Sequence, residues 1–103
     1  MYATMRRYDG VDTDRTDEVT RKVSESLVPQ LRALEGFRGY YLVDVENGVF
    51  SSFGLFEGAK QADAATEIAA SWVKTEKLES ALPNPPSITN GKVIAHENGA
   101  SVA

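Results

Sequence analysis

The first residues of the chain alternate between two faces, as the residues of a β-strand do. One face has Tyr2, Thr4, Arg6 and Tyr8, and the other has Ala3, Met5 and Arg7. Asp9-Gly10 then interrupts the alternation, because this pair of residue types is typical of a turn. The pattern predicts a first strand over residues 2–8.

Apolar residues at helical spacing follow and predict a helix of about 18 residues. This apolar stripe consists of Val19, Val23, Leu27, Leu31 and Leu34. Thr16 is the expected N-cap, since the acidic Asp17 and Glu18 after it suit the positive end of the helix dipole. Pro29 removes one backbone hydrogen bond within the stripe, which predicts a kink rather than an end. Gly36 is expected to terminate the helix.

Two β-rich runs, residues 37–46 and 49–57, are separated by Asn47-Gly48. Because this dipeptide suits the positive φ angles of a type I′ turn, the two runs are predicted to form a hairpin. A second amphipathic helix follows and loses its pattern beyond Thr75. Its apolar face has Ala62, Ala65, Ile68, Ala69, Trp72 and Val73.

The last part of the chain is predicted to be extended. Residues 83–86 read Pro-Asn-Pro-Pro, which cannot continue a helix. Residues 88–97 form the expected last strand, with Asn90-Gly91 as the place for a β-bulge. Residues 98–103 have little to bury and are expected to form a mobile tail, so the predicted domain covers residues 1–97.

The predicted order β-α-β-β-α-β defines an α+β fold. Right-handed crossovers place both helices on one face of a four-stranded antiparallel sheet, which is the ferredoxin-like arrangement. The other face of the sheet is left without cover, although both sides of the hairpin are apolar. One side has Phe37, Tyr41, Val43, Val45, Phe53 and Leu55, and the other has Tyr40, Leu42, Phe50 and Phe56. Because a monomer would expose one of these sets, the sequence predicts a homodimer that packs sheet against sheet.

Composition and charge exclude several classes of function. The 103 residues suffice for one core, and 11 Lys+Arg against 15 Asp+Glu give a net charge of -4, so nucleic acid is not an expected partner. The chain has no cysteine, which excludes disulfides and thiolate chemistry. No segment resembles a signal peptide or approaches the roughly 18 apolar residues of a membrane helix. We therefore expect a cytoplasmic protein without membrane contact.

Two short passages resemble a known superfamily. They are Leu34-Glu35-Gly36-Phe37-Arg38-Gly39-Tyr40-Tyr41, which leads from the first helix into the second strand, and Phe53-Gly54-Leu55-Phe56-Glu57. With the order of elements, they resemble the dimeric α/β-barrel superfamily, and within it the small antibiotic-biosynthesis-monooxygenase-like domains, over about residues 2–97. The resemblance implies a dimeric α/β barrel with a cavity lined by the first strand, the hairpin and the second helix. Members include cofactor-independent quinone-forming oxygenases and haem-degrading enzymes.

Arg6 is the most informative polar residue. If Ala3 and Met5 face the helices, Arg6 and Tyr8 point into the dimer interior, where the guanidinium could hold a phenolate or carboxylate. The alternative is an ion pair across the dimer seam, with Asp44 or Glu57 as the partner.

Three further side chains are candidates. Trp72 either lines the cavity, as aromatic residues do in the related oxygenases, or packs in the core. Tyr40 and Tyr41 point to opposite faces, so at most one of them serves a cavity. His96 is a candidate because histidine is the residue type best suited to proton transfer near neutral pH, but its place near the end of the last strand also fits a residue at the surface.

The candidate ligand-binding residues are therefore Arg6, Tyr8, Tyr40, Trp72 and His96, with no metal site and no cofactor. The haem-degrading relatives use a histidine on the second helix, and residues 60–82 contain none. We expect a cofactor-independent, monooxygenase-like enzyme that acts on an aromatic or phenolic substrate. The alternative is a non-catalytic ligand-binding or structural homodimer.

Overall fold

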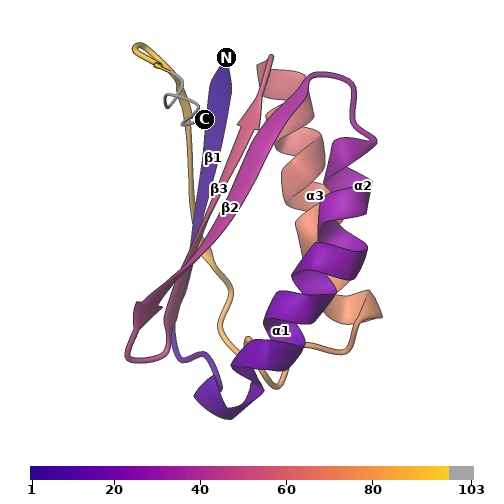
Figure 1. Cartoon of the computed structure of the whole chain (residues 1–103), viewed down its shortest axis with the longest axis vertical. Helices are drawn as coiled ribbons and strands as arrows, with labels where there is room; N and C mark the ends of the chain where they lie inside the picture. The colour runs from indigo at the N-terminus through magenta and orange to yellow at the C-terminus, as the bar shows by residue number, and fades with distance from the viewer. Residues whose placement is uncertain (98–103) are drawn as a thin grey trace, which may run out of the picture.

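A computed structural model describes residues 1–97 as a sheet with helices on one face (Figure 1). The strands are β1 (Tyr2–Tyr8), β2 (Phe37–Glu46), β3 (Val49–Phe56) and β4 (Ser87–Lys92). They form one antiparallel sheet in the order β2-β3-β1-β4. The helices are α1 (Thr16–Lys22), α2 (Val28–Arg32) and α3 (Ala59–Thr75). This arrangement confirms the predicted ferredoxin-like fold.

The first helical region is continuous but not uniform. A π-helical segment, η2 (Val23–Leu27), joins α1 to α2, and the N–H of Val28 donates to the carbonyl of Val23, five residues back. Pro29 has no N–H to offer, so the distortion occurs in the turn before it. The expectation that Pro29 perturbs the helix without ending it is confirmed. Thr16 is not the N-cap; it is the first residue of α1, and its hydroxyl donates to the carbonyl of Thr13 at 3.0 Å.

The hairpin between β2 and β3 turns where the sequence predicts. Glu46 pairs with Val49, and Glu46, Asn47 and Gly48 all have positive φ angles. The start of β2 differs from the prediction. A register shift between Phe37 and Gly39 turns Phe37 to the helix side, where its ring meets Phe56 edge to face at 5.9 Å. Phe37 therefore does not share a face with Tyr41.

The last strand is shorter and more regular than predicted. Its pairing with β1 runs without interruption from Ser87 opposite Arg7 to Lys92 opposite Tyr2, so Asn90-Gly91 forms no bulge. After Lys92 one further backbone hydrogen bond joins the N–H of Val93 to the carbonyl of Met1, at 2.8 Å. The expected tail, residues 98–103, lies outside the described residues.

The core lies between the sheet and the helices, and it corrects the face assigned to β1. Thr4, Arg6 and Tyr8 are buried on the helix side, whereas Arg7 is exposed. On β3 the large rings of Phe50 and Phe56 face the helices, and the small Ser52 and Gly54 lie between them. These small residues leave room beneath α3 for the long side chain of Arg6. The prediction that Ala3 and Met5 face the helices is therefore wrong.

No element of the described chain covers the outer face of the sheet, which carries a row of apolar side chains. Met5, Phe53 and Tyr41 lie side by side across β1, β3 and β2. The side chains of Tyr41 and Phe53 are 62% and 37% exposed. Such a contiguous apolar surface is typical of an interface. Among residues 1–97, no helix is long and apolar enough to cross a membrane.

Gly54 should be intolerant of a side chain. A Cβ atom at Gly54 would lie 2.8 Å from the ring of Phe56. We expect Gly54→Ala to lower the free energy of unfolding by about 1–3 kcal/mol, measured by urea denaturation, because overpacking displaces the ring. Gly91→Ala in β4 is the matched control, since nothing lies within 4 Å of its added Cβ atom. Equal stability of the two variants would contradict this packing.

Candidate functional site

A pocket of about 410 Å³ lies between β1, the start of β4, α3 and the segment that follows α3; we call it the β1–α3 pocket. Arg6 and Tyr8 contribute its polar inner wall. The rest of the lining comes from Thr66, Ala69, Ala70, Val73 and Lys74 of α3, from Glu79, from Leu82 to Pro86, and from Ile88. Its volume falls within the range of about 300–1,000 Å³ that is common for small-molecule sites.

The outer wall of the β1–α3 pocket is tied to the end of β1. The side-chain amide of Asn84 donates to the carbonyl of Asp9 at 3.0 Å, and the N–H of Asp12 donates to the carbonyl of Ala81 at 2.9 Å. Pro83, Pro85 and Pro86 stiffen the backbone on either side of Asn84. The sequence predicts this segment as extended, but it gives no sign that the segment forms a pocket wall.

Arg6 is the charged group at the centre of this arrangement. Its side chain is 3% exposed, and its Nε and Nη1 atoms are buried without a hydrogen-bond acceptor. The ion pairs among the described residues involve other cations, namely Arg7 with Asp9, Arg15 and Lys22 with Glu18, and Arg38 with Glu57. A buried guanidinium with two unpaired nitrogen atoms beside the neutral hydroxyls of Tyr8 and Tyr40 is costly, so Arg6 is a candidate to bind an anionic oxygen.

The acids proposed as seam partners of Arg6 have other contacts. Asp44 accepts a hydrogen bond from the backbone N–H of Glu46 at 2.8 Å, and Glu57 lies 3.8 Å from Arg38. Asp44 lies on the helix side of β2, opposite Phe50, and Glu57 is exposed; among residues 1–97 neither carboxylate forms an ion pair with Arg6.

Two tyrosines accompany Arg6 on the helix side. Burial raises the pKa of both the Tyr8 and the Tyr40 hydroxyl, and the positive charge of Arg6 offsets part of this rise. Both hydroxyls are therefore neutral and can donate a hydrogen bond near pH 7. Tyr41 points to the outer face, which confirms that Tyr40 and Tyr41 face opposite sides of the sheet.

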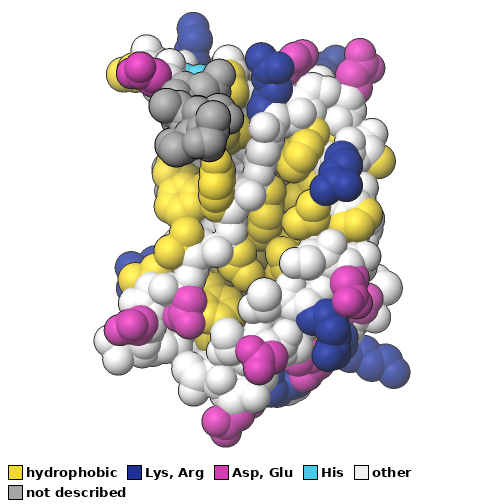
Figure 2. Space-filling view, viewed as in Figure 1, with side chains coloured by type: hydrophobic (Ala, Val, Ile, Leu, Met, Phe, Trp, Pro, Cys, Tyr) yellow, Lys and Arg dark blue, Asp and Glu magenta, His cyan; other side chains and the backbone are white. Residues whose placement is uncertain are grey.

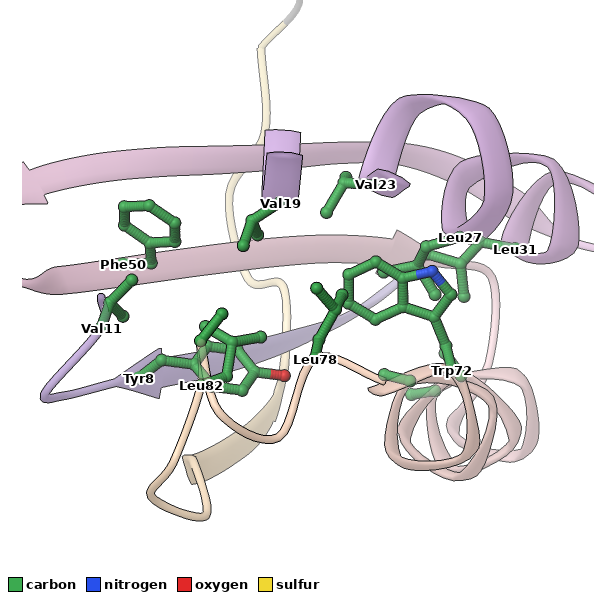
Figure 3. Close-up of a cluster of buried hydrophobic side chains, with 14 of the residues drawn as sticks. Tyr8, Val11, Val19, Val23, Leu27, Leu31, Phe50, Trp72, Leu78 and Leu82 are labelled. Carbon is green, nitrogen blue, oxygen red and sulfur yellow. The ribbon is translucent and has the colours of Figure 1, made fainter. Parts of the chain in front are cut away.

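Trp72 is buried between α3 and the first helical region. Its side chain is 3% exposed, and Figure 3 shows its indole reaching from α3 toward Leu27 and Leu31. The Nε1 atom is nonetheless buried without a partner, as are the hydroxyl oxygens of Thr4 and Ser52. Trp72 is thus packed in the core, with its indole nitrogen on the side of Leu27 and Leu31 (Figure 3).

A small apolar space, which we call the central gap, connects Trp72 with both tyrosines. Its volume is about 10 Å³. It is lined by Tyr8, Val19, Val23, Leu27, Tyr40, Leu42, Phe50, Trp72 and Leu82. Tyr8 and Leu82 also line the β1–α3 pocket, so these two side chains separate the pocket from the gap.

A second hollow, the α1–β2 hollow, lies on the other side of the central gap and has a volume of about 280 Å³. Val23, Tyr40, Leu42 and Phe50 line both the hollow and the gap. Its outer rim is formed by Thr16, Thr20, Ser24, Val28 and Asp44. Figure 2 shows hydrophobic side chains gathered along this opening between β2 and the first helices.

The structure separates His96 from the other four candidates. Because β4 ends at Lys92, the chain passes Met1 at the far end of β1, and His96 is exposed beside Met1, Arg38 and Leu55. Arg6, Tyr8, Tyr40 and Trp72 lie around the β1–α3 pocket and the central gap instead. Within residues 1–97, no group of three or more His, Asp or Glu side chains is placed to hold a metal ion.

Comparison with known proteins identifies the fold. No family model matches the chain, and no curated protein matches it. A protein of unknown function from Nitrosomonas europaea is 19% identical, with a TM-score of 0.74 over 97% of this chain and 95% of that one. A monooxygenase from Streptomyces coelicolor, in complex with nanaomycin D, is 10% identical, with a TM-score of 0.73 over 96% and 92%. A dimeric ferredoxin-like protein from an uncultured marine organism is 15% identical, with a TM-score of 0.69 over 96% and 92%.

These matches define the structural class. Antibiotic biosynthesis monooxygenases and dimeric ferredoxin-like proteins share the topology of this chain over nearly its whole length. The chain therefore has the ferredoxin-like fold that these proteins share. At identities below 20% the likeness concerns the fold, and the activity has to be argued from the site.

Replacing Arg6 should reveal the cost of its burial. We expect Arg6→Met to raise the free energy of unfolding by about 1–4 kcal/mol, because an apolar side chain of similar length removes a buried charge with two unpaired nitrogen atoms. Urea denaturation measures the change. Arg7→Met is the matched control, since Arg7 is exposed and its ion pair with Asp9 contributes at most about 1 kcal/mol. A marked loss of stability in Arg6→Met would show that Arg6 has a structural partner.

Proposed function

We propose that this protein is a cofactor-independent, monooxygenase-like enzyme that binds a small aromatic or phenolic substrate in the β1–α3 pocket. The observation that carries the proposal is the buried guanidinium of Arg6, whose Nε and Nη1 atoms have no acceptor at the inner wall of this pocket. A phenolate oxygen is an acceptor of the required charge and size. The apolar side chains of α3 and of the segment after it suit an aromatic ring.

Each proposed binding residue has its own role. Arg6 holds the anionic oxygen of the substrate and so favours its deprotonated, electron-rich form. Tyr8 offers a neutral hydroxyl beside the same oxygen. Tyr40 and Trp72 hold the inner end of the site from β2 and α3. His96 is not part of this proposal, because it lies elsewhere on the surface.

The reaction needs no external reductant. For a naphthol, one dioxygen molecule supplies one oxygen atom to the ring and one to water, while the ring loses two hydrogen atoms and becomes a quinone. The four electrons that reduce dioxygen come from the substrate itself. The protein then has to bind the anion, hold the ring and exclude water, which are tasks that this pocket suits.

A second candidate function is a ligand-binding or structural homodimer without catalysis. The close packing around the central gap favours it, since Trp72 lies against Leu27 and Leu31 and leaves only about 10 Å³. In this case Arg6 still selects an anion, but no reaction follows.

Binding and turnover of α-naphthol distinguish the two functions. We expect α-naphthol to quench the fluorescence of Trp72, the single tryptophan of the chain, and to bind at least tenfold more weakly to Arg6→Met, which corresponds to a loss of about 1.4 kcal/mol or more. Arg7→Met should bind as the wild type does. Uptake of dioxygen, with incorporation of one labelled oxygen atom into naphthoquinone, supports the enzymatic function.

Each other outcome has a definite consequence. Binding that depends on Arg6 without any oxygen uptake favours the non-catalytic function. Equal binding by the wild type and Arg6→Met overturns the proposed site.

We also propose that the protein is a homodimer in which the outer faces of two sheets meet. The row of Met5, Phe53 and Tyr41 supports this arrangement, because these apolar side chains face away from the helices and lie partly or largely open. A second copy with the same surface covers them symmetrically. One of the matching structures is described as dimeric.

A charge on the outer face should prevent this association. We expect light scattering to give twice the chain mass of 11.2 kDa for the wild type and the mass of a single chain for Phe53→Asp. The physical reason is that the dimer would bury an unpaired carboxylate. Ser71→Asp, at an exposed position of α3, is the control and should remain a dimer. A monomeric wild type at micromolar concentration contradicts the proposal.

A further inference from the structure

Substrate and dioxygen have to reach the same centre by some path. The β1–α3 pocket is the larger opening, and a bound aromatic ring would occupy it against Arg6 and Tyr8. Dioxygen that arrives after the substrate therefore needs a different way to the inner side of the ring. The α1–β2 hollow is a second opening toward the same centre, and the function proposed above does not use it.

The two openings are linked through residues that also line the central gap. The α1–β2 hollow shares Val23, Tyr40, Leu42 and Phe50 with the central gap, and the gap shares Tyr8 with the β1–α3 pocket. A path from the hollow to Tyr8 therefore passes only between side chains. The π-helical segment η2 widens the helix at the same level, and its first and last residues, Val23 and Leu27, both line the gap. Such π-helical turns are frequent at functional sites.

The size and chemistry of the central gap indicate what can pass. Its volume of about 10 Å³ is close to the space of one small molecule, so an aromatic ring does not fit. Most of its walls are apolar, with Val19, Val23, Leu27, Leu42, Phe50 and Leu82. Water needs two to four polar partners to occupy a cavity, whereas apolar cavities stay dry and accept apolar gases such as xenon. Dioxygen is an apolar gas of suitable size.

We propose that the α1–β2 hollow is a dioxygen entrance, separate from the substrate pocket, which leads through the central gap to Tyr8, Tyr40 and Trp72. This inference rests on the proposed function, because only an oxygenase needs dioxygen at this centre. The route itself can be tested without substrate, because Trp72 lines the gap and is the single tryptophan of the chain. Dioxygen that reaches the gap quenches the fluorescence of this indole by collision.

The experiment compares collisional quenching by dissolved dioxygen in the wild type and three variants. Thr20→Phe/Ser24→Phe places two rings over the hollow from exposed positions one helical turn apart. Arg21→Phe/Glu25→Phe has the same spacing and number of rings, at exposed positions that do not line the hollow. Ala70→Phe narrows the β1–α3 pocket instead.

We expect the quenching constant of dioxygen to fall several-fold in Thr20→Phe/Ser24→Phe and to stay at the wild-type value in the other two variants. Quenching by acrylamide, which is larger and polar, should be weak in all four proteins. An unchanged constant in Thr20→Phe/Ser24→Phe overturns the proposal, and so does a fall that occurs in Ala70→Phe. Strong acrylamide quenching of the wild type that Thr20→Phe/Ser24→Phe abolishes also overturns it, because the opening would then not be selective for a small gas.

A second measurement does not depend on any substitution. A crystal of the wild-type protein under xenon pressure should show xenon in the central gap, between Val23 and Trp72. Xenon confined to the β1–α3 pocket contradicts the route. These results are separate from the proposed function, since failure to oxidise α-naphthol leaves the quenching result intact, and unchanged quenching leaves naphthol binding at Arg6 intact.

Discussion

The burial of the Arg6 guanidinium under α3 is the constraint on which the site depends. It is allowed by the pairing of β1 with β3, in which Arg6 lies opposite Ser52 and Thr4 lies opposite Gly54. Larger residues at these two positions of β3 would fill the space between Phe50 and Phe56. The small residues instead create a polar centre inside an apolar core, and that centre includes five buried side-chain atoms without a partner. A core selected for stability alone would not keep such a group together, because each unpaired polar atom costs free energy.

Much of the fold follows from local patterns, whereas the face of β1 does not. Asn47-Gly48 predicts the hairpin because a two-residue turn with positive φ angles is a local property of that sequence. In β1, by contrast, each face has one arginine and at least one apolar residue, so alternation alone cannot decide which face is buried. The decision comes from β3, a strand more than 40 residues away, where small residues lie between two phenylalanines. Phe37 shows the same limit, since one extra residue in β2 reverses its face.

The sequence indicates which residues lie near the candidate site better than it indicates the shape of the pocket. Arg6, Tyr8, Tyr40 and Trp72 are unusual residue types at the predicted positions, and the structure gathers them on one side of the sheet. His96 is a candidate by residue type alone, and the early end of β4 carries it away from them. The wall formed by Leu82 to Pro86 depends on contacts such as that of Asn84 with Asp9, which join residues 75 positions apart. No periodic pattern in a sequence contains that information.

The position of Arg6 also changes the part that a dimer can play. An arginine at the sheet-to-sheet seam would make binding depend on the second chain, because a partner acid or a shared cavity would then complete the site. Arg6 faces the opposite way, toward α3 of its own chain, and the β1–α3 pocket, the central gap and the α1–β2 hollow lie on the helix side of the sheet. The apolar row on the outer face and the polar centre beneath α3 lie on opposite faces of the same three strands. A dimer that covers the outer face would therefore leave the helix side of each sheet, with Arg6, to its own chain.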